Sequence, residues 1–166
     1  MALPNDLLEQ SKHLAKRESK RPRQASLRRA VSTVYYALFH HLISEATLNW
    51  KRASQRNQFA RLFEHGKMKS ASIMQRSYVN AYLKTKPGPS PELECAKHLH
   101  HIAETFTKAQ EWRHLADYDN SKRWSRNEVL TLIDPVEEAF RRWHEIRDEE
   151  AAQDFLLSLL GTPKAN

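Results

Sequence analysis

Apolar positions recur with the period of an α-helix along most of this chain. The clearest run lies between about residues 23 and 48. Its apolar positions are separated by 4, 3, 4 and 4 residues and comprise Leu27, Val31, Val34, Leu38 and Leu42. Because such spacings return to the same face of a helix, these side chains form one continuous stripe. The length of the run is typical of the central helix of a bundle.

Helices are also expected on either side of this run. Asn5 belongs to the residue types that cap helix N-termini, and it predicts a first helix that continues to about Lys20. Pro22 then breaks the helix because it has no backbone N–H to donate. After the central run the pattern is less regular and basic. It predicts a short helix around Phe59 and another around Val79.

The C-terminal half contains two sharp helix starts. The Ser-Pro pair at residues 90–91 predicts a capped helix that ends near Ala116, because proline is favoured in the first helical turn. Ser125 and Glu128 have the spacing of a capping box and open the last long helix. Within that helix, Pro135 predicts a kink or a restart.

These elements together predict an all-α fold, an antiparallel four- to five-helix up-and-down bundle. The chain has 166 residues, only three of them glycine, which suits one helical domain over residues 1–166. Its core is expected over about residues 5–145. An apolar cluster near the C-terminus predicts a helical extension over about residues 146–161, which either closes the bundle or contacts a second copy.

Cysteine content and hydropathy narrow the class of protein. Cys95 is the only cysteine, so an intramolecular disulfide is impossible and a cysteine-based zinc cluster is not expected. The first ten residues lack the long apolar run of a signal peptide. No segment reaches the apolar length of a membrane span. The sequence therefore predicts a cytoplasmic protein that does not enter a membrane.

Charge is distributed unevenly around a net value of +7. Residues 1–86 contain 17 Lys/Arg and 5 Asp/Glu, whereas residues 87–166 contain 10 and 15. A basic half attracts polyanions such as RNA, and it would equally attract an acidic protein or the acidic half of a second copy. The densest basic run includes Lys20, Arg21 and Arg23, which form either a phosphate track or an ordinary solvated face.

Polar residues form a second stripe on the central helix. Arg29, Tyr36 and His40 are separated by 7 and 4 residues and lie within roughly 40° of one another, with Thr33 near the same line. Arginine offers a planar fork to phosphate, tyrosine a stacking face and histidine a titratable proton. The stripe therefore predicts an anion-binding site. The alternative is that these polar side chains lie inside the bundle and form hydrogen bonds with one another.

A second polar constellation ends the helix that precedes Ser125. Arg113 is followed within one or two turns by Asp117, Tyr118 and Asp119. These residues are candidates for ligand binding, and the alternative is an Arg–Asp clasp that ties the helix end to its neighbour. His98 and His101 lie one turn apart, but no carboxylate completes a zinc-helix motif, so we expect neither a metal site nor a cofactor.

The two constellations together resemble the HEPN superfamily. Residues 28–40 read Arg-Arg-Ala-Val-Ser-Thr-Val-Tyr-Tyr-Ala-Leu-Phe-His, which is similar to the long second helix of small prokaryotic HEPN proteins. Residues 113–119 resemble the Arg-x-x-Ala-Asp-Tyr-Asp segment of an uncharacterised HEPN branch. The resemblance implies a helical bundle that often forms a two-fold dimer. Relatives are metal-independent RNases, toxins paired with a nucleotidyltransferase antitoxin, or modules that bind RNA or nucleotides.

The resemblance implies a function and leaves catalysis open. We expect a bundle that binds RNA or a nucleotide in a prokaryotic toxin–antitoxin or defence system, as a homodimer and with a nucleotidyltransferase-type antitoxin as a candidate partner. The RNase branch has an Arg followed by a His four to six residues beyond. Here the corresponding positions hold Asp, Tyr and Asp. A metal-independent endoribonuclease toxin, with Arg113 and His40 as candidate catalytic residues, and a non-catalytic protein-interaction module are the alternatives.

Overall fold

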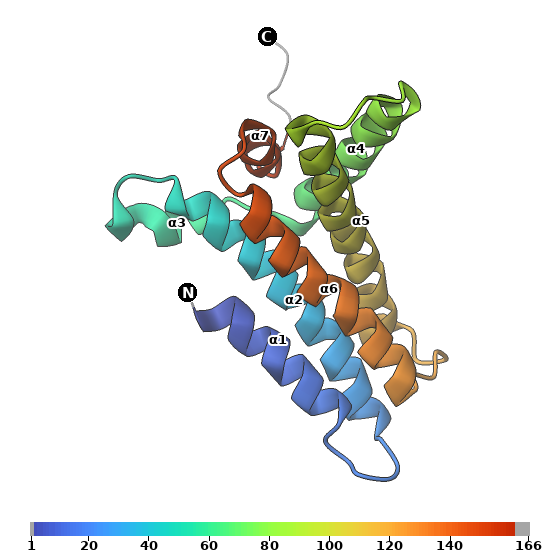
Figure 1. Cartoon of the computed structure of the whole chain (residues 1–166). Coiled ribbons are helices and arrows are strands. Elements are labelled where there is room, and N and C mark those ends of the chain that lie inside the picture. The colour runs from blue at the N-terminus through green and yellow to red at the C-terminus, as the bar shows by residue number, and fades with distance from the viewer. Residues whose placement is uncertain (1, 162–166) are drawn as a thin grey trace. The chain divides into compact units, whose positions relative to one another are not determined.

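The structure is a computed structural model that describes residues 2–161. Its elements follow the chain as α1 (Ala2–Ala15), α2 (Gln24–Leu48), the 3-10 helix η1 (Ala53–Gln55), α3 (Arg56–Ala60), α4 (His65–Lys84), α5 (Pro91–Tyr118), α6 (Arg126–Ile146) and α7 (Glu150–Ser158) (Figure 1). The described residues contain no β-strand. The predicted all-α helical bundle is therefore confirmed.

The chain divides into two compact units. Unit 1 comprises Met1–His41 and Thr105–Arg141, and unit 2 comprises Leu42–Glu104 and Arg142–Asn166, each as far as it is described. Three long helices, α2, α5 and α6, contribute one part to each unit. The expectation of a single domain stays a prediction.

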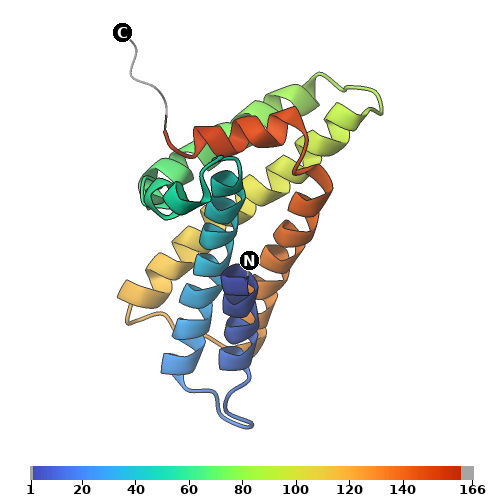
Figure 2. The same ribbon diagram turned by 90° about the vertical axis from the view of Figure 1, so that its left-hand side faces the viewer.

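Unit 1 contains α1, the first part of α2, the end of α5 and the first part of α6. Figures 1 and 2 both show α1 alongside α2, with the two helices joined by a short loop at one end, so their directions are opposed. The predicted stripe supplies this core, since Leu27, Val31, Val34 and Leu38 are fully buried. At the unit's edge, the Lys12 ammonium pairs with the Glu137 carboxylate at 2.7 Å and links α1 to α6.

Unit 2 contains α4 and α7 together with the first part of α5, the end of α2 and the end of α6. Its core includes large buried side chains from each of these five segments, namely Leu42, Met68, Leu99, Trp143 and Phe155. The apolar cluster predicted near the C-terminus is thus buried inside this unit. The helical extension expected from residue 146 onward is therefore part of the core of unit 2.

The first helix differs from its prediction at both ends. It begins at Ala2, so Asn5 lies inside the helix and does not cap it, and it ends at Ala15 instead of Lys20. Polar contacts between residues five and eight positions apart stabilise the following loop. The Glu18 carboxylate accepts hydrogen bonds from the Ser26 hydroxyl at 2.7 Å and from the Arg23 backbone N–H at 3.3 Å. The chain therefore leaves the helix well before Pro22 requires it to.

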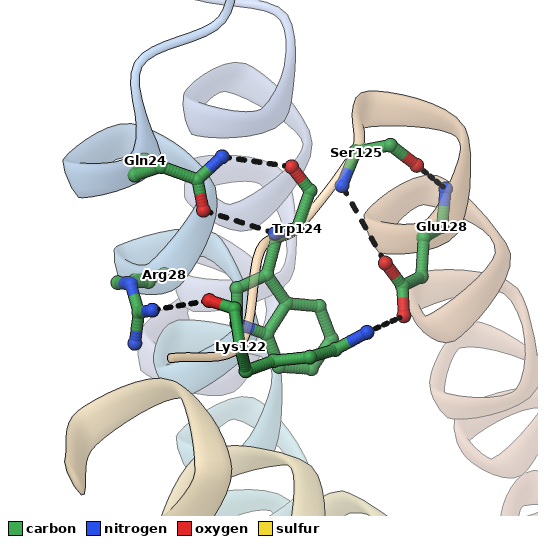
Figure 3. Close-up of polar contacts among 6 residues, drawn as sticks. All are labelled: Gln24, Arg28, Lys122, Trp124, Ser125 and Glu128. Atoms are coloured by element: carbon green, nitrogen blue, oxygen red, sulfur yellow. Dashed lines mark hydrogen bonds and ion pairs between the residues drawn. The ribbon is translucent and has the colours of Figure 1, made fainter. Parts of the chain in front are cut away.

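Both predicted helix starts in the C-terminal half are confirmed. The Ser90 hydroxyl accepts a hydrogen bond from the backbone N–H of Leu93 at 3.1 Å. The Ser125 hydroxyl accepts from the Glu128 N–H at 3.1 Å, and the Glu128 carboxylate accepts from the Ser125 N–H at 3.5 Å (Figure 3). Pro135 lies inside one continuous helix, so the predicted restart is wrong.

Candidate functional site

The predicted stripe of helix α2 lines a groove in unit 1. Arg29, Thr33, Tyr36 and His40 form one wall. The other wall belongs to α1 and consists of Leu3, Leu7, Gln10 and Leu14. The volume of this α1–α2 groove is about 520 Å³. Spacing along one helix thus placed four polar or aromatic residues together, whereas the facing wall of leucines comes from a helix for which no site was predicted.

Arg29 is a cation without a partner at the end of this groove wall. It is exposed, and its guanidinium forms no hydrogen bond or ion pair with any residue between 2 and 161. Charged groups that lack an internal partner remain hydrated and available to ligands. A planar guanidinium beside a concave surface is suited to phosphate or carboxylate.

Tyr36 and His40 form an aromatic surface along the same wall. Their ring centroids lie 6.2 Å apart with the planes inclined by 30°, a stacked arrangement. Burial lowers the pKa of His40 below its ordinary value because the charged imidazolium is poorly solvated there. At neutral pH the imidazole is therefore uncharged. It offers one N–H donor, one nitrogen acceptor and a flat face.

Arg113 reaches the edge of this site without lining the groove. Its guanidinium carbon lies 5.3 Å from the ring centroid of Tyr35 and 5.8 Å from that of Tyr36, both within range of a cation–π interaction. Its Nη1 also pairs with the Asp117 carboxylate at 3.6 Å. Among the described residues, the two predicted groups of polar side chains therefore meet only where Arg113 contacts Tyr36. No contact between Arg113 and His40 is present among these residues.

The segment after Arg113 forms a structural clasp. Asp117 accepts a hydrogen bond from the Ser32 hydroxyl on α2, in addition to its ion pair with Arg113. Asp119 accepts hydrogen bonds from the backbone N–H and the hydroxyl of Ser121 at 2.9 and 2.6 Å, and these bonds lower the pKa of its carboxyl. Tyr118 is 67% exposed, and its ring lies outside the groove. The alternative of an Arg–Asp clasp thus fits Asp117, whereas Asp119 is bonded within its own turn.

Arg28 lies directly before Arg29 on α2 but does not line the groove. Its guanidinium donates hydrogen bonds to the backbone carbonyls of Ala116 and Asp119, both at 2.9 Å, and to that of Lys122 (Figure 3). The last carbonyls of a helix have no partner within the helix, so a side chain from α2 satisfies them here. Helix spacing places Arg29 and not Arg28 on the face of Tyr36 and His40, but it does not indicate that Arg28 bonds the turn after α5.

The turn between α5 and α6 is fixed by a second contact from α2. The Gln24 side-chain amide donates to the Trp124 carbonyl at 2.8 Å and accepts from the Trp124 N–H at 2.9 Å (Figure 3). Lys122 lies 4.8 Å from the centre of the Trp124 ring and pairs with Glu128 at 2.6 Å. This turn is therefore bonded to α2 through Gln24 and to α6 through Glu128.

The remaining predicted binding residues lie on the loop between α1 and α2. Lys20, Arg21 and Arg23 are all exposed, and none of them lines the α1–α2 groove. Their ammonium and guanidinium groups remain accessible to a polyanion. The structure thus separates the predicted set into groove residues, clasp residues and an exposed basic loop.

Two further predictions concern metals and membranes. No group of three or more His, Cys, Asp or Glu within residues 2–161 could hold a metal ion. His98 instead faces the Glu145 carboxylate at 3.2 Å. None of the described helices is both long and apolar enough to cross a membrane.

Comparison with protein-family models, with curated proteins and with solved structures finds no match for this chain. The resemblance to HEPN proteins therefore stays a prediction that rests on the residues of α2 and α5 quoted above.

Proposed function

We propose that this chain is a HEPN-type helical bundle that binds RNA or a nucleotide in the α1–α2 groove. The observation that carries the proposal is the combination of an unpaired Arg29 with the stacked Tyr36 and His40 on one wall. A base would stack on the aromatic surface and be covered by the leucines of α1. A phosphate would bind the guanidinium. The volume of the groove lies in the range of small-ligand sites.

The exposed basic loop supports RNA in preference to a free nucleotide. Phosphates of a longer strand that leaves the groove would find Lys20, Arg21 and Arg23 accessible, and neutralising several phosphates releases counterions and adds affinity. The HEPN resemblance supports a role in a prokaryotic toxin–antitoxin or defence system. It also supports a homodimer and a nucleotidyltransferase-type antitoxin partner as parts of the same proposal.

Binding without cleavage is the version that the geometry favours. Metal-free cleavage at the 2′-hydroxyl needs a base, an acid and a cation at the phosphate. Arg113 is already engaged by Asp117 and by two tyrosine rings, so it is poorly placed to follow a reacting phosphate. The neutral imidazole of His40 is the correct form for a general base, however, and it lines the same groove as Arg29. An endoribonuclease that uses these two residues is therefore the second candidate.

One experiment tests both versions. End-labelled single-stranded RNA is incubated with the protein in the presence of a metal chelator, and retention and cleavage are measured together. The variants are Arg29→Ala, His40→Ala and, as a matched control, Arg123→Ala, which removes an exposed arginine of unit 1 that does not line the groove. We expect Arg29→Ala to weaken retention about tenfold, the loss of one charged hydrogen bond. The control should change it by less than about twofold.

The outcomes separate the candidates. Retention that falls with rising salt, without cleavage, supports the binding module. Cleavage that is lost in both His40→Ala and Arg29→Ala moves the conclusion to the endoribonuclease. Retention that is equal in Arg29→Ala and Arg123→Ala contradicts the groove as the binding site. No retention even at low salt rejects the proposal and leaves a protein-interaction module.

A further inference from the structure

A second cavity lies entirely within unit 2. Residues of α4, α5 and α7, together with Glu149 just before α7, line it, and its volume is about 460 Å³. Its lining combines aromatic and acidic side chains, namely Tyr78, Tyr82, Glu92, Glu149, Glu150 and Asp154. A basic side chain does not occur in this lining, although the chain as a whole has 27 Lys and Arg against 20 Asp and Glu. We call it the α4–α5–α7 cavity.

The four carboxylates of this cavity have no internal partner. None of them accepts a side-chain hydrogen bond or forms an ion pair with another described residue. The neighbouring Glu94, which does not line the cavity, pairs with Lys97 at 3.3 Å. Glu92 and Glu150 lie in the first turns of α5 and α7, where the helix dipole favours negative charge. The dipoles stabilise these carboxylates and leave their oxygens available.

Aromatic surface is exposed at the same place. Tyr78 is 78% exposed although tyrosine rings are commonly at least half covered in folded proteins, and Tyr82 is partly exposed beside it. An aromatic face attracts cations through its quadrupole, and carboxylates attract them by charge. The two kinds of side chain in one cavity therefore select an organic cation over a neutral or an anionic ligand.

The interior end of the cavity carries a polar group without a partner. Cys95 lines it as a free thiol that is 4% exposed, and no hydrogen bond to its sulfur is present among the described residues. Burial, together with the charge of Glu149, raises the pKa of this thiol. The thiol is therefore protonated at neutral pH. It is a weakly polar group in a lining that also contains the Gln75 amide and the hydroxyls of Tyr78 and Tyr82.

The carboxylates are distributed in a way that disfavours an inorganic ion. Calcium and magnesium require several oxygens converging on one point. In the part of the chain that the structure describes, no three acidic, histidine or cysteine side chains form such a group. Carboxylates that do not converge on one point match a ligand whose own positive charges are separated by a flexible apolar chain.

We propose that the α4–α5–α7 cavity binds a small linear polyamine. Its ammonium groups pair with Glu92 from α5 and with Glu150 and Asp154 from α7, and its methylene chain and one ammonium lie against Tyr78. The site belongs to unit 2 and does not depend on RNA binding in the α1–α2 groove. Loss of either site can therefore be measured without loss of the other.

The test is isothermal titration calorimetry of the whole chain with spermidine, in low-salt buffer and with a metal chelator. Hexane-1,6-diol, which has a similar apolar chain but no charge, is the ligand control. The variants are Tyr78→Ala and Glu150→Gln. Asp148→Asn is the protein control, because it removes the same charge two residues from Glu150 at an exposed position that does not line the cavity.

We expect one spermidine per chain and no heat from the diol. Tyr78→Ala should weaken the affinity about three- to tenfold, as expected for a cation–π contact and lost apolar cover, and Glu150→Gln about threefold. Asp148→Asn should change it less than twofold. Far-UV circular dichroism of each variant must match the wild type, and for a variant that fails this check the more conservative Tyr78→Leu or Asp154→Asn replaces it.

Three results would overturn the proposal. The first is no saturable binding of spermidine at millimolar concentration. The second is an equal weakening by Asp148→Asn and Glu150→Gln, because diffuse charge attraction would then explain the binding. The third is a lysine-rich peptide that binds the same residues more tightly than spermidine does, which would assign the cavity to a protein partner. Retention of RNA by Arg29→Ala has no bearing on any of these.

Discussion

Arg28 is expected to be the arginine of helix α2 on which the stability of unit 1 depends most. Its guanidinium bonds the carbonyls of Ala116, Asp119 and Lys122, which lie in the turn that connects α5 to α6. The substitution Arg28→Ala removes all of these hydrogen bonds at once. It leaves carbonyls at the end of α5 that have no partner within the helix.

The magnitude follows from the number and the setting of these bonds. A hydrogen bond from a charged donor is worth about 1.5–3 kcal/mol when it is well shielded. Arg28 is only partly buried, so water replaces some of what is lost, and about 1 kcal/mol for each bond is the better value. Arg28→Ala should therefore lower the free energy of unfolding by about 3 kcal/mol. For a chain of this size that corresponds to a fall in Tm of about 6–12 °C.

The neighbouring arginine provides the control. Arg29 lies one residue further along the same helix and has no partner among the described residues, so Arg29→Ala should change the free energy of unfolding by less than about 0.5 kcal/mol. Arg28→Lys keeps the charge but not the planar fork and should cost about 2 kcal/mol. Urea denaturation followed by far-UV circular dichroism measures all three. Equal losses in Arg28→Ala and Arg29→Ala, with unchanged m-values, would refute the assignment.

Three further outcomes are expected. Burial lowers the pKa of His40, so the unfolded chain takes up a proton more readily than the folded one. The free energy of unfolding should therefore fall as the pH drops below about 6.5. In a pH series of urea titrations, His40→Gln should reduce this pH dependence. Ser125→Ala removes the hydroxyl of the capping box and should cost about 1 kcal/mol in the same assay, with no cost contradicting the cap. Asp117→Asn deprives the partly buried Arg113 of its ion-pair partner while an amide oxygen can still accept from Ser32. It should cost about 1 kcal/mol, and a double-mutant cycle with Arg113→Ala that shows no coupling would exclude this contact.

The local sequence pattern was sufficient to predict where most helices lie. The stripe from Leu27 to Leu42 predicted α2 within a residue at its start, and the serines before α5 and α6 predicted where those helices begin. These features depend on neighbours at most four residues away in the sequence, so they can be read without knowing the fold. The end of the first helix was wrong because Ser26 and Arg126 stabilise the loop that follows it, with Arg126 bonding the carbonyl of Ala15 from the start of α6.

The candidate site also has a part that the sequence predicted and a part that only the tertiary structure decided. The spacing of Arg29, Tyr36 and His40 determined by itself that they share one helix face, and the structure shows them lining one groove. The facing leucines of α1, the contrast between Arg28 and Arg29 and the carboxylates gathered in the α4–α5–α7 cavity were decided only by tertiary structure. Because a helix has a regular repeat, the spacing of residues in the sequence shows which of them share a face. Which face meets which neighbour depends on packing between segments that lie far apart in the sequence, such as those of Gln24 and Trp124, 100 residues apart, and no local spacing encodes that choice.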